Sequence, residues 1–248
     1  MLLELQGLKI AKVPIRRHIV FSLRCHLQRP IHRVKVITDQ LVCYGGHMSL
    51  TPKGKISKKE IIDAAILEFS QGSYTEISLN QFCKNNGISK GHLYHYFEGK
   101  EALYLESVHE TYQLMMHYIV DHTEKISNYE QGLSQYLDAR YAFGKEYPDH
   151  SRLFIHTRYN VPEQLREPIR SIKQQLLDFN LNYFRTVLEH ATLEKGLSIE
   201  DVLEYYLVVN DAFDARFHEI DSVDIDQHFK DIELVINMMM FGTIKRGQ

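Results

Sequence analysis

Residues 78–103 read SLNQFCKNNGISKGHLYHYFEGKEAL, and this stretch decides the fold of the chain. Ser78 and Ser89 each stand where a side chain can cap the start of a helix, and Gly87 supplies the positive φ that a tight interhelical turn favours. The stretch predicts two short helices around a turn, followed by a helix that starts at Lys100. This layout is a helix-turn-helix, which places one helix in the major groove of DNA.

A further capped helix precedes this stretch. Ser57 and Glu60 have the spacing of a capping box, in which a serine and a glutamate satisfy each other's open backbone N–H groups. Ser78 with Gln81 predicts a second capping box. Apolar residues at helical spacing mark the faces that we expect to be buried. They are Ile61, Ile62, Ala65, Ile66, Phe69, Leu79, Phe82, Cys83, Leu93 and Phe97.

The order of these residues resembles the DNA-binding domain of tetracycline-repressor (TetR/AcrR) type transcriptional regulators. In motif, the resemblance covers about residues 57–105. Two positions depart from the family pattern: Asn86 stands where a small apolar residue is usual, and Gly99 where a polar helix cap is usual. The residues that carry the resemblance are Ser78, Gly87, Ile88, Ser89, Lys90, Gly91, Leu93, Tyr94, Tyr96, Phe97, Lys100, Glu101 and Leu103.

The resemblance implies a DNA-contacting surface on the second helix of the motif. A lysine at its start meets phosphate or a base edge, a glycine lets the backbone approach DNA, and tyrosine hydroxyls bond phosphates. A lysine at the start of the next helix anchors the DNA backbone. Together with a basic arm before the first helix, the predicted DNA-binding residues are Lys53, Lys55, Ser78, Asn80, Ser89, Lys90, Gly91, His92, Tyr94, His95, Tyr96 and Lys100.

Other interpretations of this surface stay open. Tyr94 and Tyr96 could be core aromatics instead of phosphate ligands. His92 and His95 share a helix face and could suggest a metal pair, but no third ligand lies nearby in sequence, so we predict no metal site. The lysines around residues 53–59 could follow the DNA backbone or minor groove, or simply be solvated.

Composition limits the remaining functions. The chain has 248 residues and a net charge of −3, and its three cysteines are too few for a disulfide framework, which suits the cytoplasm. No apolar run approaches the roughly 20 residues of a membrane helix, so we expect no membrane partner. Asp149, His150 and Ser151 are suitable residue types for catalysis, but neighbours in sequence do not assemble a triad. We therefore predict no enzyme, no catalytic residue and no cofactor.

Residues 1–47 are unusual because they hold eight basic and two acidic residues, whereas residues 101–248 hold fourteen basic and twenty-five acidic ones. The segment shows neither a signal-peptide organisation nor a clean helical or strand period. Two adjacent glycine codons at Gly45 and Gly46 can encode a ribosome-binding sequence shortly before Met48. We therefore expect Met48 to be the native start, with residues 1–47 a translated leader; a basic arm that adds DNA affinity is the alternative.

The rest of the chain predicts helices throughout. We expect them at about 100–126, 129–146, 149–156, 162–190, 198–220 and 224–243. The predicted fold is all-α: an N-terminal three-helix helix-turn-helix domain joined by a long helix to a C-terminal ligand-binding and dimerisation domain. The domains are a leader or basic extension at 1–47, the DNA-binding domain at 48–105 and the helical body at 106–248.

The last two helices are more apolar than a monomer normally needs, and in the resembling family they form a four-helix dimer interface. A homodimer is also expected because one helix-turn-helix makes too few contacts for useful specificity; a two-fold dimer reads two half-sites. The predicted interface residues are Tyr206, Val209, Phe213, Phe217, Val235 and Met239.

The middle helices are rich in tyrosine and methionine, which usually make core. Tyrosine also brings a hydroxyl that needs a partner, so these residues suit an apolar cavity with polar handles. By resemblance, we expect this cavity to bind a small apolar or amphipathic effector. Its predicted lining is Tyr112, Met115, Met116, Tyr136, Phe143, Phe154, Tyr159 and Tyr183.

These observations favour a homodimeric repressor that binds a palindromic operator in double-stranded DNA and is released by a small-molecule inducer. A division or nucleoid-associated factor of the same fold, controlled by a protein partner, would use the same motif. A thermal-shift screen separates the two, because the second would gain no stability from any small ligand. A helical enzyme is the remaining alternative.

Overall fold

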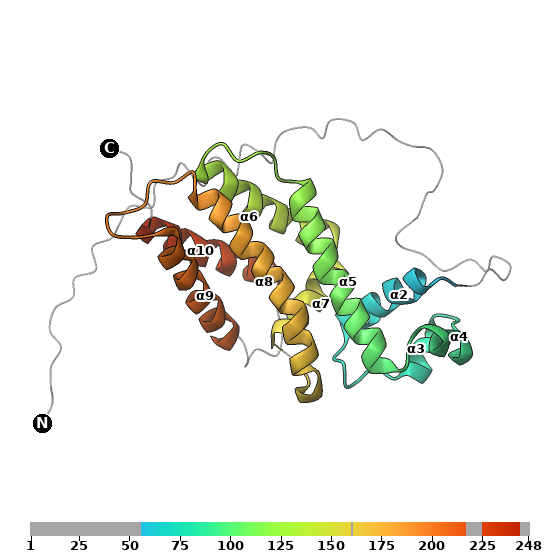
Figure 1. Ribbon diagram of the computed structural model, residues 1–248. Helices are drawn as coiled ribbons and strands as arrows, with labels where there is room; N and C mark the ends of the chain where they lie inside the picture. The colour runs from blue at the N-terminus through green and yellow to red at the C-terminus, as the bar shows by residue number, and fades with distance from the viewer. Residues whose placement is uncertain (1–55, 160, 217–224, 244–248) are drawn as a thin grey trace, which may run out of the picture. The chain divides into compact units, whose positions relative to one another are not determined.

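The computed structural model describes residues 56–159, 161–216 and 225–243, and the regular structure in these ranges is mainly helical (Figure 1). The first helices are α2 (Lys58–Gln71), α3 (Leu79–Asn85), α4 (Lys90–Tyr96) and the long α5 (Lys100–Asp121). They are followed by α6 (Tyr129–Glu146), α7 (Pro148–Tyr159), the 3-10 turn η1 (Glu163–Leu165), α8 (Arg166–Leu188), α9 (Ile199–Arg216) and α10 (Ile225–Thr243). The expected all-α fold is confirmed. No helix in the described ranges is long and apolar enough to cross a membrane.

Local capping chemistry explains why the first helices begin where they do. The Glu60 N–H donates to Ser57 Oγ at 3.2 Å and the Ser57 N–H donates to Glu60 Oε2 at 2.6 Å, which confirms the first capping box. Ser89 Oγ accepts from the His92 N–H at 3.2 Å and so caps α4. Gly87 has a φ of 65°, as the turn between α3 and α4 requires.

The second predicted capping box is wrong. The Ser78 side chain makes no capping hydrogen bond at the start of α3. Gln81 instead donates from Nε2 to Asn85 Oδ1 at 2.6 Å, one turn further along the same helix. The Ser78 hydroxyl therefore caps no backbone N–H, and the Gln81 side chain does not return to the Ser78 N–H.

The two departures from the family pattern have different outcomes. Asn86 Nδ2 donates to Glu68 Oε1 on α2 at 3.2 Å and to the Phe82 carbonyl on α3 at 2.9 Å. An amide thus joins the two helices where a small apolar residue would only fill space. At Gly99, which precedes α5, no side chain caps the helix.

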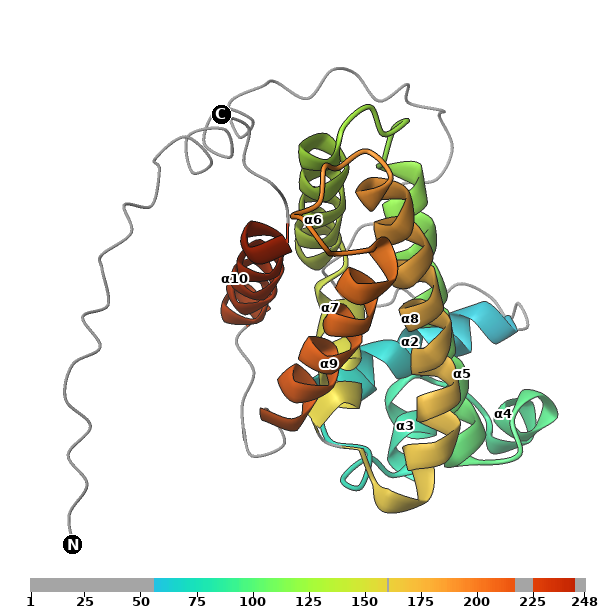
Figure 2. The ribbon, with the colours of Figure 1, turned by 60° about the vertical axis from the view of Figure 1, so that its left-hand side comes forward.

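Helix α5 connects the helix-turn-helix to the body. Its buried residues include Leu103 and Tyr104 near its start and Tyr112 and Met115 further along. Helix α2 packs on both α5 and α7, and α5 also packs on α6 and α8 (Figure 2). A single hydrophobic core therefore runs from the first helices into the body.

Several helix bounds differ from those expected. Helix α6 agrees with the prediction, whereas α5 ends at Asp121 instead of 126 and α7 is longer than the expected 149–156. Pro162 precedes the 3-10 turn η1, so α8 begins only at Arg166. Ser198 caps α9 as predicted, because its Oγ accepts from the Asp201 N–H at 3.1 Å. Residues 1–47 and the predicted cap at Asp224 lie outside the described residues.

Candidate nucleic-acid interface and effector cavity

Helix α4 has one buried and one exposed face. Leu93 is fully buried and Phe97, which ends the helix, is 4% exposed, whereas Tyr94 is 55% exposed and Tyr96 is 37% exposed. The two tyrosines thus lie outside the core. The other predicted DNA-binding side chains that are exposed on α3, on α4 and at their starts are Ser78, Asn80, Ser89, Lys90 and His95, together with the backbone at Gly91.

The rings on α4 contact one another. The Tyr96 ring meets the His92 ring edge to face, with centroids 5.3 Å apart, and the His95 ring at 4.8 Å. Such edge-to-face pairs restrict ring orientation. His92 also bonds through Nε2 to the Ile56 carbonyl, just before α2. His92 therefore links α4 to the start of the first helix, and its half-buried ring supports Tyr96.

Lys100 bonds to the protein's own backbone. Its ammonium donates to the Tyr74 carbonyl at 2.7 Å and to the Ile77 carbonyl at 2.9 Å, and lies 4.2 Å from the centre of the Tyr74 ring. An ammonium has three donors, so one N–H remains beyond these two bonds. Lys100 thus fixes the loop between α2 and α3 to the start of α5. Lys53 and Lys55 lie outside the described residues.

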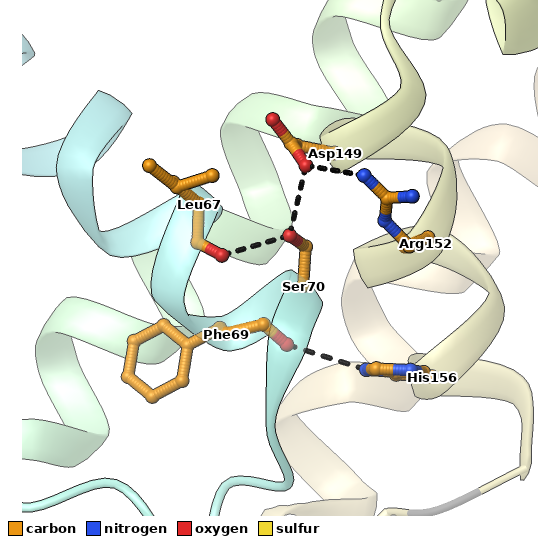
Figure 3. A network of polar contacts seen from close by, with 6 residues as sticks. All are labelled: Leu67, Phe69, Ser70, Asp149, Arg152 and His156. Carbon is orange, nitrogen blue, oxygen red and sulfur yellow. Dashed lines mark hydrogen bonds and ion pairs between the residues drawn. The ribbon is translucent and has the colours of Figure 1, made fainter. Parts of the chain in front are cut away.

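The end of α2 is joined to α7 by polar contacts that the sequence did not reveal (Figure 3). Ser70 Oγ donates to Asp149 Oδ1 at 3.2 Å, and Arg152 pairs with the same carboxylate oxygen at 2.8 Å. His156 Nδ1 lies 3.2 Å from the Phe69 carbonyl oxygen, and because a carbonyl only accepts, this nitrogen carries the proton. Burial lowers the pKa of His156, which favours the neutral ring.

Most of the predicted cavity residues lie in the packed core. Tyr112, Met115, Phe143 and Phe154 are at most 2% exposed. The Tyr112 hydroxyl bonds to Thr157 Oγ1 at 2.9 Å, and the Tyr183 hydroxyl donates to the Gly132 carbonyl at 2.8 Å. Met116 is half-buried against the core, and the side chain of Tyr159 is outside the described residues. Of the predicted set, Tyr136 lines the cavity found in the body.

That cavity lies among α6, α7, α8, α9 and α10 and has a volume of about 50 Å³. One part of its wall is apolar, from Val209 on α9 and Ile232, Val235 and Ile236 on α10. The other part is polar. It consists of Tyr136, Arg140, Arg158, Asn180, Tyr206 and Asn210.

The predicted dimer residues whose side chains the structure describes lie on the inward faces of α9 and α10. Tyr206, Val209 and Val235 line the cavity. The large apolar side chains that α9 and α10 expose are Tyr205 (52%), Val208 (59%), Leu234 (58%) and Met238 (68%). The side chains of Phe213, Phe217 and Met239 lie outside the described residues.

The fold and the exposed face of α4 define an all-helical protein with a helix-turn-helix. Residues 61–107 match the family of bacterial regulatory proteins described as tetR. This match confirms, for the helix-turn-helix part of the chain, the resemblance to TetR-type regulators that the motif predicted, and the relatives that the chain matches are transcriptional regulators.

Two curated relatives illustrate this likeness. The HTH-type regulator YuxN of Bacillus subtilis is 28% identical over 159 residues, which covers 62% of this chain and 54% of YuxN. IcaR of Staphylococcus epidermidis, a negative transcriptional regulator of the biofilm operon icaADBC, is 27% identical over 183 residues, covering 70% of this chain and 93% of IcaR. The chain spans about half the length of YuxN and of several other curated relatives that it matches.

Solved structures share the fold. SmeT, the repressor of the multidrug efflux pump SmeDEF of Stenotrophomonas maltophilia, superimposes with a TM-score of 0.56 at 15% identity, covering 77% of this chain and 92% of SmeT. At this identity the likeness concerns the fold alone.

Proposed function

We propose that this chain represses transcription in the cytoplasm by binding a palindromic operator as a homodimer, and that a small molecule bound in the body releases it. The observation that carries the proposal is the exposed polar face of α4 over the buried Leu93. A recognition helix needs this arrangement, because one face must pack on the domain while the other reads the groove. The description of IcaR as a negative regulator supports repression over activation.

In this proposal the two exposed tyrosines of α4 and the Asn80 side chain bond DNA phosphates, which set affinity and position. Lys90 and the backbone at Gly91, in the first turn of α4, approach the base edges. A Cβ built on Gly91 would meet no protein atom within 4 Å, so the space beside it is open to a DNA strand. The Ser78 hydroxyl, which caps no helix, adds a phosphate ligand.

The dimer would form through α9 and α10. Tyr205 and Val208 are three apart on α9, and Leu234 and Met238 are four apart on α10, so each pair lies on one helix face. Two copies of these exposed apolar faces would bury each other in a two-fold interface. Such a dimer would present its two α4 helices to half-sites about 34–36 Å apart or a multiple of that.

Helix α7 would carry the signal between the two functions. Arg158 near its end lines the cavity, while Asp149, Arg152 and His156 lie in the contact network with α2 (Figure 3). A ligand that moves α7 would therefore move α2 and the helices packed beside it. To release DNA, the ligand needs only to bind the helix arrangement that has low DNA affinity more tightly than the arrangement that has high DNA affinity.

The test is a titration of the wild-type chain and the Tyr94→Phe variant with an operator selected from a random duplex library by the wild-type chain. Loss of the hydroxyl removes one phosphate bond, so affinity should fall by about five- to tenfold with the fold intact. Tyr141→Phe is the matched control, since Tyr141 is a comparably exposed tyrosine on α6. Selection of no operator, or equal affinities for all three proteins, would contradict the proposal.

A further inference from the structure

The cavity in the body contains a buried arginine without a carboxylate partner. Arg140 is 5% exposed and donates from a terminal guanidinium nitrogen to the Tyr136 hydroxyl at 3.0 Å. Its Nε is buried without a hydrogen-bond partner, and among the described residues no carboxylate pairs with it. The rings of Phe154 and Tyr136, at 5.4 Å and 5.8 Å, offset only part of the cost of burying this charge.

The hydrogen bonds beside Arg140 leave a donor unused. Tyr136 donates to Asn180 Oδ1 at 2.9 Å, and Asn180 Nδ2 donates to the Tyr206 hydroxyl at 3.2 Å. The Tyr206 proton then has no acceptor among the described residues. If the oxygen and nitrogen of the Asn180 amide exchange places, the Tyr206 hydroxyl donates to the amide oxygen, and the Tyr136 hydroxyl proton is the one without an acceptor. In both arrangements the polar wall offers more donors than acceptors, so it lacks an acceptor group.

A second arginine, Arg158, belongs to the same polar wall. Its guanidinium donates to Asn210 Oδ1 at 3.3 Å. Burial together with Arg158 and Arg140 lowers the pKa of the nearby His228 to about 3. Burial, the largest cause, disfavours a charge of either sign, whereas the two arginine charges disfavour a cation and favour an anion at this place.

We propose that the effector is an amphipathic anion, whose carboxylate or other oxyanion pairs with Arg140 and whose apolar part lies against α10. This inference rests on the proposed function and specifies its ligand class. A planar guanidinium binds such oxyanions with paired, charge-assisted hydrogen bonds, and the unused tyrosine hydroxyl supplies another donor. The cavity of about 50 Å³ accommodates the head group.

The apolar part then needs additional space. Ligand sites for drug-sized molecules are roughly 300–1,000 Å³, so the helices must separate to admit a longer chain. The apolar wall comes from Ile232, Val235 and Ile236 on α10, which packs on α6 and α9. Displacement of α10 would also change the surface assigned to the dimer. The sequence alone predicted an apolar or amphipathic effector and did not specify its charge.

The experiment measures binding to the full chain by calorimetry with four eight-carbon probes: octanoate, octyl phosphate, octanamide and octylamine. We expect octanoate or octyl phosphate to bind at least about tenfold more tightly than the amide and the amine. The ratio of the octanoate affinity to the octyl phosphate affinity identifies the preferred oxyanion. In Arg140→Met this preference should disappear, whereas Arg170→Gln, an exposed arginine on α8, should keep it. If Arg140→Met does not fold, Tyr206→Phe or Tyr136→Phe, whichever removes the unused donor, should reduce octanoate affinity about threefold.

Equal binding of all four probes, or tighter binding of the amine, would overturn the anion assignment while leaving a ligand-responsive regulator. Unchanged octanoate affinity in Arg140→Met would overturn it as well. If the tyrosine variants replace Arg140→Met, unchanged affinity in both of them would overturn it. Absence of binding by either anion would also count against it. Operator binding measured without any probe tests the proposed function separately, because it needs no effector.

Discussion

Ser70 at the end of α2 places its hydroxyl oxygen 3.2 Å from the carboxylate of Asp149, in the first turn of α7 (Figure 3). The same oxygen lies 2.8 Å from the Leu67 carbonyl, and Ser70 is 2% exposed. The carboxylate is also held by Arg152. A buried polar contact therefore joins helix α2, beside the helix-turn-helix, to a helix that lines the cavity in the body.

Replacement of Ser70 by alanine should weaken this connection. We expect a loss of about 1 kcal/mol in the free energy of unfolding, measured by urea denaturation, because a buried hydrogen bond is removed. We also expect a saturating effector to change operator affinity by a smaller factor than in wild type. Ser134→Ala is the control, since Ser134 makes a comparable bond to Asp138 at 3.2 Å on the exposed face of α6. An unchanged effector response in Ser70→Ala would exclude this contact from the coupling.

The sequence predicted the helix-turn-helix well because local chemistry determines it. The cap at Ser57, the cap at Ser89 and the positive φ of Gly87 each depend on a few neighbouring residues. The predicted capping box at Ser78 was wrong for an equally local reason. The Gln81 side chain bonds to Asn85. The residue types alone do not decide which of two nearby groups a glutamine side chain bonds to.

The cavity could not be predicted in the same way. It arises from five helices, and its charged member Arg140 belongs to a residue type that is mostly exposed. Of the aromatic residues expected there, Tyr136 lines the cavity, whereas Tyr112, Phe143 and Phe154 fill the core. Tyr206, which the sequence predicted at a dimer interface, lines the cavity, whereas its neighbour Tyr205 is exposed. Because successive helical residues differ by about 100° around the axis, that step turns an outward side chain inward.

The buried histidines predict how stability depends on pH. Burial lowers the pKa of His150, His156 and His228, the last to about 3, from an unfolded value of about 6.5. Between the folded and unfolded values the unfolded chain binds more protons, so stability rises with pH and is lost as the pH falls. Between its folded and unfolded pKa values, each histidine changes the free energy of unfolding by up to about 1.4 kcal/mol per pH unit.

Urea denaturation between pH 7 and pH 5 should therefore show falling stability for the wild-type chain. His228→Gln should reduce the slope by about 1 kcal/mol per pH unit below pH 6, because glutamine does not titrate. The control is His117→Gln, which makes the same substitution at an exposed position on α5. The same slope in all three proteins would contradict the assignment to His228.

Lys100→Ala should affect both stability and DNA binding. Removal of the ammonium leaves the Tyr74 and Ile77 carbonyls without this donor, so we expect a loss of about 2 kcal/mol in the free energy of unfolding. If the third N–H meets a phosphate, the slope of log affinity against log salt should fall by about 1 for every DNA sequence. Lys125→Ala, in the loop after α5, is the control. Lower stability with an unchanged salt slope would restrict Lys100 to its structural role.

Gly144 on α6 permits the close approach of α10. A Cβ at this position would lie only 2.3 Å from a ring atom of Phe229, so Gly144→Ala must push the ring or the helix away. Overpacking of this kind costs about 1–3 kcal/mol, which should appear as a lower melting temperature and weaker closure of the cavity. Gly91→Ala on α4 is the matched control, because a Cβ there meets no atom within 4 Å.

A second substitution separates this contact from a general intolerance of alanine in α6. Phe229→Leu removes the ring that the new methyl group would strike, so the double variant Gly144→Ala/Phe229→Leu should be more stable than the sum of the two single effects predicts. Thermal denaturation of the four proteins measures this coupling. Additive effects of the two substitutions would contradict this explanation, as would a Gly144→Ala variant as stable as Gly91→Ala. Either result would show that α10 does not depend on Gly144 to pack against α6.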